Sequence, residues 1–212
     1  MVKRFELLKI FAAMISDDTL VVTPTGNTSK FWDRLGKGEK SLSDVTLGMC
    51  TPTALGLSLA LPHRRVVALD SDGNLLLNLA SLGTVANENP ANLLIIVFDN
   101  ANYNSGGPGR GKAGMPTATA GKLNLEAVAR GCGLKNAATV SDADAFREAV
   151  SKGLKEEGPS FIVARVDPVD DPAEGAQSRI KERSFDRRQN KYMFAMRIEQ
   201  MENIQILKPK IG

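Results

Sequence analysis

The sequence is poor in the residues that build disulfide frameworks, metal clusters and membrane spans. Its two cysteines, Cys50 and Cys132, lie far apart without a CxxC spacing, which predicts free thiols in a reducing compartment. Its one histidine, His63, stands in a Pro-His-Arg-Arg turn, where we expect a surface residue rather than a catalytic one. No apolar run approaches the ~20 residues that span a bilayer. We therefore expect a soluble, cytoplasmic protein without a membrane partner.

Neither sign of charge is in large excess. The formal net charge of +3 is too small to predict nucleic-acid binding. The N-terminus has a basic start and an apolar stretch, as a signal peptide does. However, Glu6 and Lys9 interrupt that stretch and no small-residue cleavage site follows it. The segment 5–15 therefore predicts an amphipathic helix.

The 212 residues, of which 42% are hydrophobic and 24% charged, are typical of a soluble globular domain. Short β-branched runs predict strands at 19–23, 65–69, 93–98, 138–140 and 161–166. Helical stripes lie between them, formed by Leu75, Leu79, Leu82 and Ala86, by Leu125, Val128, Ala129 and Cys132, and by Phe146, Ala149 and Val150. This alternation predicts an α/β fold with an open parallel sheet and helices on both faces.

Two segments depart from the alternation. Residues 104–121 are rich in Gly, Pro and Thr and too long for a passive connection, which predicts a functional loop. We expect the domain to end at 167, with 168–212 forming a linker and a helix-strand extension. In that extension, Phe194, Ile198 and Met201 mark the helix and 204–207 the strand. The basic stretch 179–191 is interpreted as a solvated face or a subunit contact.

Small polar residues and glycines follow three of the predicted strands. They occupy 24–29, 70–74 and 99–103. In an open parallel sheet, ligands bind beyond the carboxyl ends of the strands, where free backbone N–H groups at helix starts face anions. Asp72 and Asn100 offer one carboxylate and one amide oxygen, a suitable pair for Mg²⁺ that leaves positions for water and phosphate. The alternative for Asp72 is a helix cap, because Asp-Gly is also common in turns.

The spacing of these residues resembles a known motif. Ser71-Asp72-Gly73 is followed after 26 residues by Asn100 at the end of a hydrophobic strand. This resembles the Gly-Asp-Gly and asparagine motif of thiamine-diphosphate enzymes. The upstream segments 47–49 and 52–61 are similar to those of 2-oxoacid decarboxylases, above all sulfopyruvate and phosphonopyruvate decarboxylases. The resemblance covers 6–167.

The resemblance implies a role for each matching residue. Thiamine diphosphate and Mg²⁺ are the implied cofactors. Asp72 and Asn100 would bind the metal through side-chain oxygens, and Asn102 through its backbone carbonyl. The residues expected to contact the cofactor are Gly26, Asn27, Thr28, Ser29, Gly48, Met49, Gly73, Asn74, Asn102 and Tyr103. Met49 would lie beneath the bent cofactor, although an ordinary core methionine is the alternative, and 106–121 would close over the site.

The sequence also departs from the family. Ser71 replaces the first glycine of the motif, and Cys50 stands where a second glycine is common. The family's enzymes need a glutamate that activates the pyrimidine, on a separate pyrimidine-binding domain for which this chain has no room. The resemblance therefore implies no catalytic acid in this chain, inactivity alone, and a hetero-oligomer with a pyrimidine-binding subunit.

Two other functions compete with this interpretation. Residues 106–112 (GGPGRGK) nearly match a P-loop, but Ala113 replaces the Mg²⁺-binding Ser or Thr, and Pro116 interrupts the helix that should follow. The chain could instead be a non-catalytic interaction subunit with the same fold. The sequence does not distinguish between 2-oxoacid substrates, or between decarboxylation and carboligation.

Overall fold

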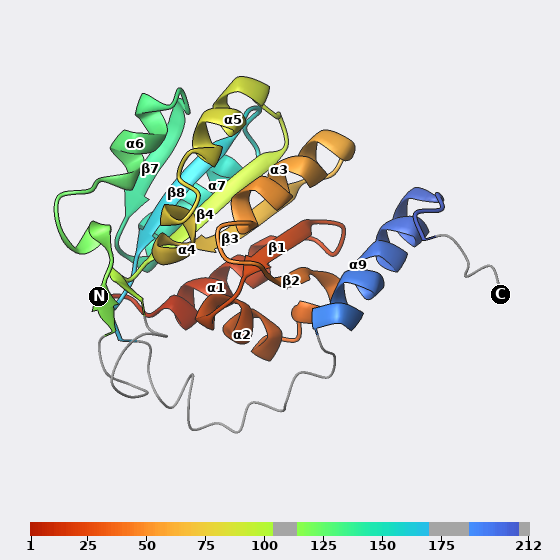
Figure 1. The fold of residues 1–212 in the computed structure, drawn as a ribbon, viewed down its shortest axis with the longest axis horizontal. Coiled ribbons are helices and arrows are strands. Elements are labelled where there is room, and N and C mark those ends of the chain that lie inside the picture. The colour runs from red at the N-terminus through yellow and green to blue at the C-terminus, as the bar shows by residue number, and fades with distance from the viewer. Residues whose placement is uncertain (104–113, 170–186, 208–212) are drawn as a thin grey trace.

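The computed structural model describes residues 1–103, 114–169 and 187–207 and contains a parallel sheet of six strands (Figure 1). Their order is β2-β1-β3-β4-β8-β7. The strands are β1 (Leu20–Pro24), β2 (Leu42–Val45), β3 (Val66–Ser71), β4 (Leu93–Asp99), β7 (Asn136–Val140) and β8 (Ser160–Arg165). A separate antiparallel ribbon joins β5 (Asn102–Tyr103) to β6 (Met115–Pro116).

Helices cover both faces of the sheet (Figure 1). One face carries α3 (Cys50–Ala60), α4 (Asp72–Leu76), α5 (Ser81–Glu88), α6 (Leu125–Gly131) and α9 (Arg187–Glu202). The other carries α1 (Arg4–Met14), α2 (Asn27–Arg34) and α7 (Ala143–Gly153). The described part of the chain also contains two 3₁₀ turns, η1 (Gly38–Lys40) and η3 (Ala118–Ala120).

Strand β4 shows why the sheet needs two helical layers. All seven of its residues are buried. Leu93, Ile95 and Val97 face the first helical layer, and the alternate residues Leu94, Ile96 and Phe98 face the second. Burying one such side chain contributes about 1.5–3 kcal/mol, so a strand apolar on both faces is stable only when both are covered.

The predicted fold class is confirmed, and each of the five predicted strands forms within two residues of its expected bounds. Strand β2 was not predicted, because its four residues, Leu-Ser-Asp-Val, include two polar ones. Its outer edge is held by a side chain instead of another strand. Asn190 Oδ1 accepts from Ser43 N at 2.7 Å, and Asn190 Nδ2 donates to Ser41 O at 3.0 Å.

Two details of the prediction were wrong. The stripe from Leu75 to Ala86 does pack on one core, but it belongs to two helices, separated by tight turns such as Leu77 N to Asn74 O at 3.2 Å. The segment 204–207 is not a strand. The backbone N–H groups of its last two residues both donate to Glu199 Oε1 at 2.6 Å, so they need no partner strand.

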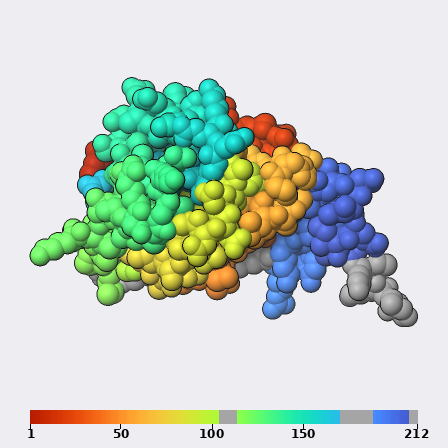
Figure 2. Space-filling model, turned by 90° about the horizontal axis from the view of Figure 1, so that it is seen from above, coloured from red at the N-terminus to blue at the C-terminus, as the bar shows by residue number. Residues whose placement is uncertain are grey.

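The predicted C-terminal helix is confirmed as α9, which lies at one end of the molecule beside α3 (Figure 2). Its Phe194 and Ile198 are buried in the core. Of the predicted linker and basic stretch, 170–186 lie outside the described residues. No helix in the described ranges is long and apolar enough to cross a membrane.

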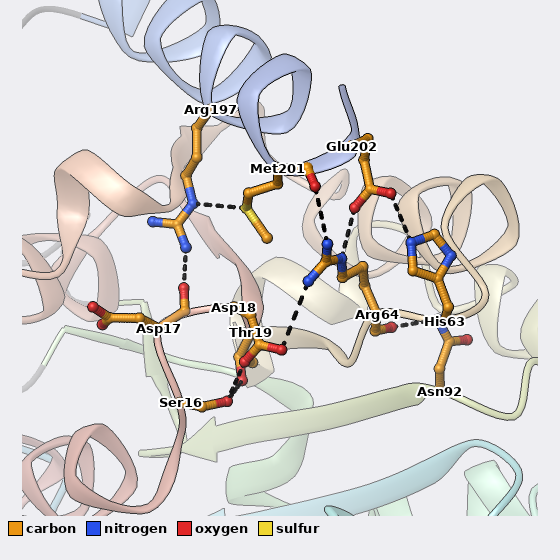
Figure 3. Close-up of polar contacts among 10 residues, drawn as sticks. All are labelled: Ser16, Asp17, Asp18, Thr19, His63, Arg64, Asn92, Arg197, Met201 and Glu202. Carbon is orange, nitrogen blue, oxygen red and sulfur yellow. Dashed lines mark hydrogen bonds and ion pairs between the residues drawn. The ribbon is translucent and has the colours of Figure 1, made fainter. Parts of the chain in front are cut away.

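A polar clamp fixes the C-terminal end of α9 (Figure 3). Arg64 donates from Nε to Glu202 Oε1 at 2.6 Å and from Nη2 to Met201 O at 3.1 Å. Exposed His63 places Nε2 2.7 Å from Glu202 Oε2. Arg197 donates to the carbonyl of Asp17 before β1. His63 is thus a surface residue, as predicted.

Replacing Glu202 should loosen the C-terminal turns of α9. Glu202→Gln keeps the shape of the side chain but removes the charge that pairs with Arg64, so the backbone amides of 195–202 should exchange hydrogen faster. The matched control is Glu156→Gln, which alters the exposed pair with Lys152 at 3.6 Å. Unchanged exchange in Glu202→Gln would show that the clamp does not hold the helix.

The same clamp predicts a pH dependence. The hydrogen bond from Arg64 is the main cause that lowers the pKa of Glu202 in the folded chain below its ordinary 4.5. Its stabilising effect is therefore present above pH 4.5 and lost as the pH falls through the lowered pKa. Wild-type α9 should loosen on acidification below pH 4.5, while Glu202→Gln should lack that step.

Candidate metal and diphosphate site

Three strand ends meet on one edge of the sheet. Strands β1, β3 and β4 are parallel neighbours, so the polar residues that follow them lie close together in space. These are the segments that the sequence predicted as a ligand site. The helices α2 and α4 begin at two of these strand ends.

The first strand end leads into α2. Gly26 takes the N-cap position with φ 130°, a conformation that favours glycine, and nothing lies within 4 Å of where its Cβ would be. Asn27 begins the helix, whose first backbone N–H groups attract anions. Thr28 and Ser29 are buried in its first turn. The arrangement leaves room for an anion at Gly26.

A buried cation that sequence reasoning missed lies beside this turn. Arg4 is only 4% exposed and donates from Nη1 to Thr28 Oγ1 at 3.2 Å. It also lowers the pKa of Asp72 electrostatically, against the larger effect of burial. Arg4 was missed because an arginine at the start of an amphipathic helix normally faces water. Its positive charge favours anion binding at this edge.

The second strand end places Asp72 as the first residue of α4, with 1% of its surface exposed. Ser71 holds the N-cap position, so the structure does not support Asp72 as the cap. Two hydroxyls that the sequence did not single out reach its Oδ2, Thr117 Oγ1 at 2.7 Å and Thr119 Oγ1 at 3.3 Å. Thr119 Oγ1 also lies 2.7 Å from Asp99 Oδ1 at the end of β4. These threonines bring the two strand-end carboxylates together.

Burial makes ionisation of Asp72 unfavourable. It raises the pKa of Asp72 from 3.8 to about 6, with Asp99 adding to the rise and the hydrogen bond from Thr117 opposing it. A rise of this size corresponds to about 3 kcal/mol. A cation would offset this cost by pairing with the carboxylate.

The third strand end turns sharply after Asn100. Buried Asn100 donates from Nδ2 to Pro168 O at 3.3 Å. Ala101 follows with φ 57°, the left-handed region that costs a non-glycine residue energy. Its N–H donates to Asp99 Oδ1 at 3.1 Å, which holds the turn. Asn102 Nδ2 donates to Asn100 O at 3.0 Å, so the side chain of Asn102 supports the turn as well.

Tyr103 and Gly73, both predicted at the site, lie against each other. A Cβ on Gly73 would be 2.6 Å from Tyr103 Cε1, so only glycine allows this contact. Of the predicted loop, 104–113, including the P-loop-like segment and Ala113, lie outside the described residues. In the described rest of this segment, β6 pairs with β5 and η3 follows it.

Gly48 and Met49 lie in the turn before α3, beside α4. Met49 is 44% exposed, so the alternative of a core methionine is wrong. Gly48 N donates to Asn74 Oδ1 at 2.8 Å, so the side chain of Asn74 holds this turn instead of pointing to solvent. Only the backbone of Asn74 remains for the predicted contact with a diphosphate.

Within the described ranges, no three Asp, Glu, His or Cys side chains gather in a way that could hold a metal ion. A cation at Asp72 would therefore take its other ligands from amide, backbone and phosphate oxygens or from water, as Mg²⁺ commonly does. The structure brings Asp72 together with Gly73 and Tyr103, and links its carboxylate to the third strand end through Thr119.

The buried charge of Asp72 predicts that Asp72→Asn stabilises the ligand-free chain at pH 7–8. Its folded pKa is raised above 3.8, so its contribution to stability is complete below pH 3.8 and is lost as the pH rises through about 6. Asparagine still accepts from Thr117 but carries no charge. Urea unfolding should show a gain of up to about 3 kcal/mol at pH 8 that shrinks toward zero near pH 4. Equal stability of the two proteins at pH 8 would contradict the pKa shift.

Comparison with known proteins shows the family of the chain. Residues 33–164 match the family described as thiamine pyrophosphate enzyme, C-terminal TPP binding domain. The range contains Gly48, Met49, Asp72 and Asn100, whereas the α2 turn precedes it.

Individual relatives cover most of the chain. Sulfopyruvate decarboxylase subunit beta of Methanocaldococcus jannaschii is 29% identical over 80% of this chain and 86% of that protein. The subunit beta of Methanococcus maripaludis is 30% identical over 78% and 84%. Phosphonopyruvate decarboxylase of Streptomyces viridochromogenes is 30% identical over 78% of this chain but only 40% of that protein.

The solved structures agree on the fold. A Mycobacterium smegmatis protein described as a thiamin diphosphate-dependent enzyme superposes with a TM-score of 0.62 at 22% identity, over 79% of this chain and 32% of that one. The family match over 33–164 and the relative at 30% identity identify the chain as a member of the thiamine pyrophosphate enzyme family that carries its C-terminal TPP-binding domain.

Proposed function

We propose that this chain is the diphosphate- and Mg²⁺-binding subunit of a thiamine-diphosphate-dependent 2-oxoacid decarboxylase that a partner subunit completes. The observation that carries the proposal is the buried carboxylate of Asp72 at the meeting point of three strand ends, in a chain of the thiamine pyrophosphate enzyme family. The relatives named sulfopyruvate decarboxylase subunit beta support the decarboxylase class.

Asp72 and Asn100 are the proposed side-chain ligands of Mg²⁺, with the backbone carbonyl of Asn102 as a third. The donor set fits the metal, because Mg²⁺ prefers a few hard oxygens and keeps its remaining positions for water and phosphate. The raised pKa of Asp72 also fits, since a cation relieves the cost that burial places on the carboxylate.

The diphosphate is proposed to lie between the starts of α2 and α4. Gly26 leaves open space there, and Asn27, Thr28 and Ser29 begin a helix whose N–H groups suit an anion. The backbone of Gly73 and Asn74 begins the second helix. Arg4 adds a buried positive charge behind the α2 turn.

Gly48, Met49 and Tyr103 are proposed to face the rings of the cofactor. Bound thiamine diphosphate supplies the electron sink that decarboxylation of a 2-oxoacid needs. The chain's own part is to bind and orient it. Thr117 and Thr119 would exclude water from Asp72 and, by their hydrogen bonds, hold its carboxylate in one orientation.

A partner subunit with a pyrimidine-binding domain is proposed to supply the activating glutamate. The relatives of similar length are named as beta subunits, which supports a hetero-oligomer. Phosphonopyruvate decarboxylase, of which this chain covers 40%, has room for a further domain. The proposed substrate is a small anionic 2-oxoacid. A non-catalytic interaction subunit would not need the buried charge of Asp72.

Cofactor binding should depend on Asp72. Thiamine diphosphate with Mg²⁺ at 100 times its Kd should stabilise the wild-type chain by about 2.7 kcal/mol, a rise on the order of 5–10 °C in melting temperature. Asp72→Asn should abolish the rise. Asp142→Asn is the matched control, because asparagine caps α7 as well as the Asp142 side chain does. A rise in melting temperature of the same size in Asp72→Asn would contradict the assignment of Asp72 as a metal ligand.

Activity should require a second polypeptide. The purified chain should not decarboxylate sulfopyruvate, phosphonopyruvate or pyruvate, even with excess Mg²⁺ and thiamine diphosphate, because it lacks the proposed glutamate. Adding a pyrimidine-binding subunit should restore turnover, and replacing that subunit's glutamate by glutamine should remove it. Turnover by the pure chain at an ordinary enzymatic rate, roughly 1–1000 per second, would contradict the proposal.

A further inference from the structure

We infer that Asn74 and Asn78 are positioning residues, which fix the Gly48–Met49 turn to the start of the metal-site helix and so present Met49 to the ring portion of the cofactor. The inference rests on the proposed function. It concerns four side chains, those of Asn74, Asn78, Asp70 and Thr51, of which only Asn74 belongs to the predicted site.

The turn itself is a tight one. Met49 N donates to Thr46 O at 3.0 Å, and Gly48 has φ 75° while Leu47 does not lie in the left-handed region. This is the pattern of a type II turn, in which the third residue is usually glycine. A Cβ on Gly48 would also lie 3.3 Å from Asn78 Cβ, so a larger residue would require the neighbouring asparagine to shift.

Both peptide groups of Gly48 are held from the opposite element. Its N–H donates to Asn74 Oδ1 at 2.8 Å, and its carbonyl accepts from Asn78 Nδ2 at 3.1 Å. The two asparagines are four residues apart, one in α4 and one in the turn that follows. Two hydrogen bonds on adjacent peptides fix the orientation of the turn as well as its distance from α4.

Asp70 fixes which way the Asn74 amide points. Asn74 Nδ2 donates to Asp70 Oδ1 at 2.5 Å, and a carboxylate can only accept, so the amide oxygen must face Gly48. Asp70 is itself held by the N–H of Ser71 at 2.8 Å and by Thr51 Oγ1 at 2.8 Å. Thr51 lies in α3, the helix that the turn leads into.

The network thus closes a ring between two parts of the site. It runs from the end of β3 through Asn74 to Gly48, and returns from α3 through Thr51 to Asp70. Asp70, Asn74 and Thr51 are all buried. Met49, in contrast, is 44% exposed, and its N–H and carbonyl are both used within the turn and α3. A fixed backbone beneath an exposed side chain is what a docking surface for a ring requires.

The experiment compares two ligands on the full chain by calorimetry with Mg²⁺. Thiamine diphosphate reports on the metal site and the turn together, whereas inorganic diphosphate reports on the metal site alone. Asn78→Ala should raise the Kd of thiamine diphosphate about tenfold. The variant loses one hydrogen bond, which costs about 1.4 kcal/mol, and this free energy corresponds to a factor of ten in Kd. The Kd of inorganic diphosphate should change less than twofold. Asn92→Ala is the matched control, because buried Asn92 donates to three carbonyls at the far end of α3, away from the turn.

A second measurement needs no ligand. Asn74→Ala should speed hydrogen exchange of the Gly48 amide at least tenfold relative to Asn92→Ala, because the Gly48 N–H loses its acceptor. Two results would overturn this inference but not the proposed function. One is that wild type binds both ligands and Asn78→Ala loses equal affinity for each. The other is that the Gly48 amide of Asn74→Ala exchanges hydrogen no faster than that of Asn92→Ala. Failure of wild type to bind either ligand would instead overturn the proposed function.

Discussion

The hydrogen bonds that Thr117 and Thr119 make to Asp72 connect the parts on which the site depends. The carboxylate stands at the end of β3, and Thr119 joins it to Asp99 at the end of β4. Both threonines follow β6, so the ribbon formed by β5 and β6 is tied to the sheet at this point. Burial opposes the charge of Asp72 and raises its pKa to about 6, and the hydrogen bond from Thr117 relieves only part of that cost. A cation bound at Asp72 would therefore lower the free energy of the site, because it would offset the cost of burying the carboxylate.

The sheet determines where such a site can form. Strands apolar on both faces leave polar chemistry to their ends, and parallel strands put those ends on one edge. At this edge, the start of α2 leaves open space at Gly26 beside the positively charged Arg4. Helix α4 carries the Asp72 carboxylate, and the Gly48–Met49 turn carries the exposed side chain of Met49. The hydrogen bonds that Asn74 accepts from Gly48 N and that Asn78 donates to Gly48 O join the last two, so the proposed diphosphate and ring contacts are held together.

The sequence predicted the features that follow from local pattern. β-branched runs such as 93–98 gave the strands, and residue order placed Asp72 and Asn100 at neighbouring strand ends. It missed features that depend on distant contacts. Strand β2 needs Asn190, 147 residues away, to hold its edge, and Arg4 is buried beside α2, where Thr28 accepts its hydrogen bond. The break between α4 and α5 also escaped prediction, because one apolar stripe continues across both helices. The strand expected at 204–207 failed because Glu199 bonds its backbone locally.

The measurement that tests this account most directly is a crystal structure of the chain with its partner subunit, Mg²⁺ and thiamine diphosphate. The account predicts a metal ion about 2.0–2.1 Å from an Asp72 carboxylate oxygen and from the Asn100 amide oxygen. It also predicts the diphosphate at the starts of α2 and α4, with Met49 against the cofactor rings. A metal ion bound elsewhere, or a cofactor that leaves the Asp72 carboxylate paired only with Thr117 and Thr119, would contradict it.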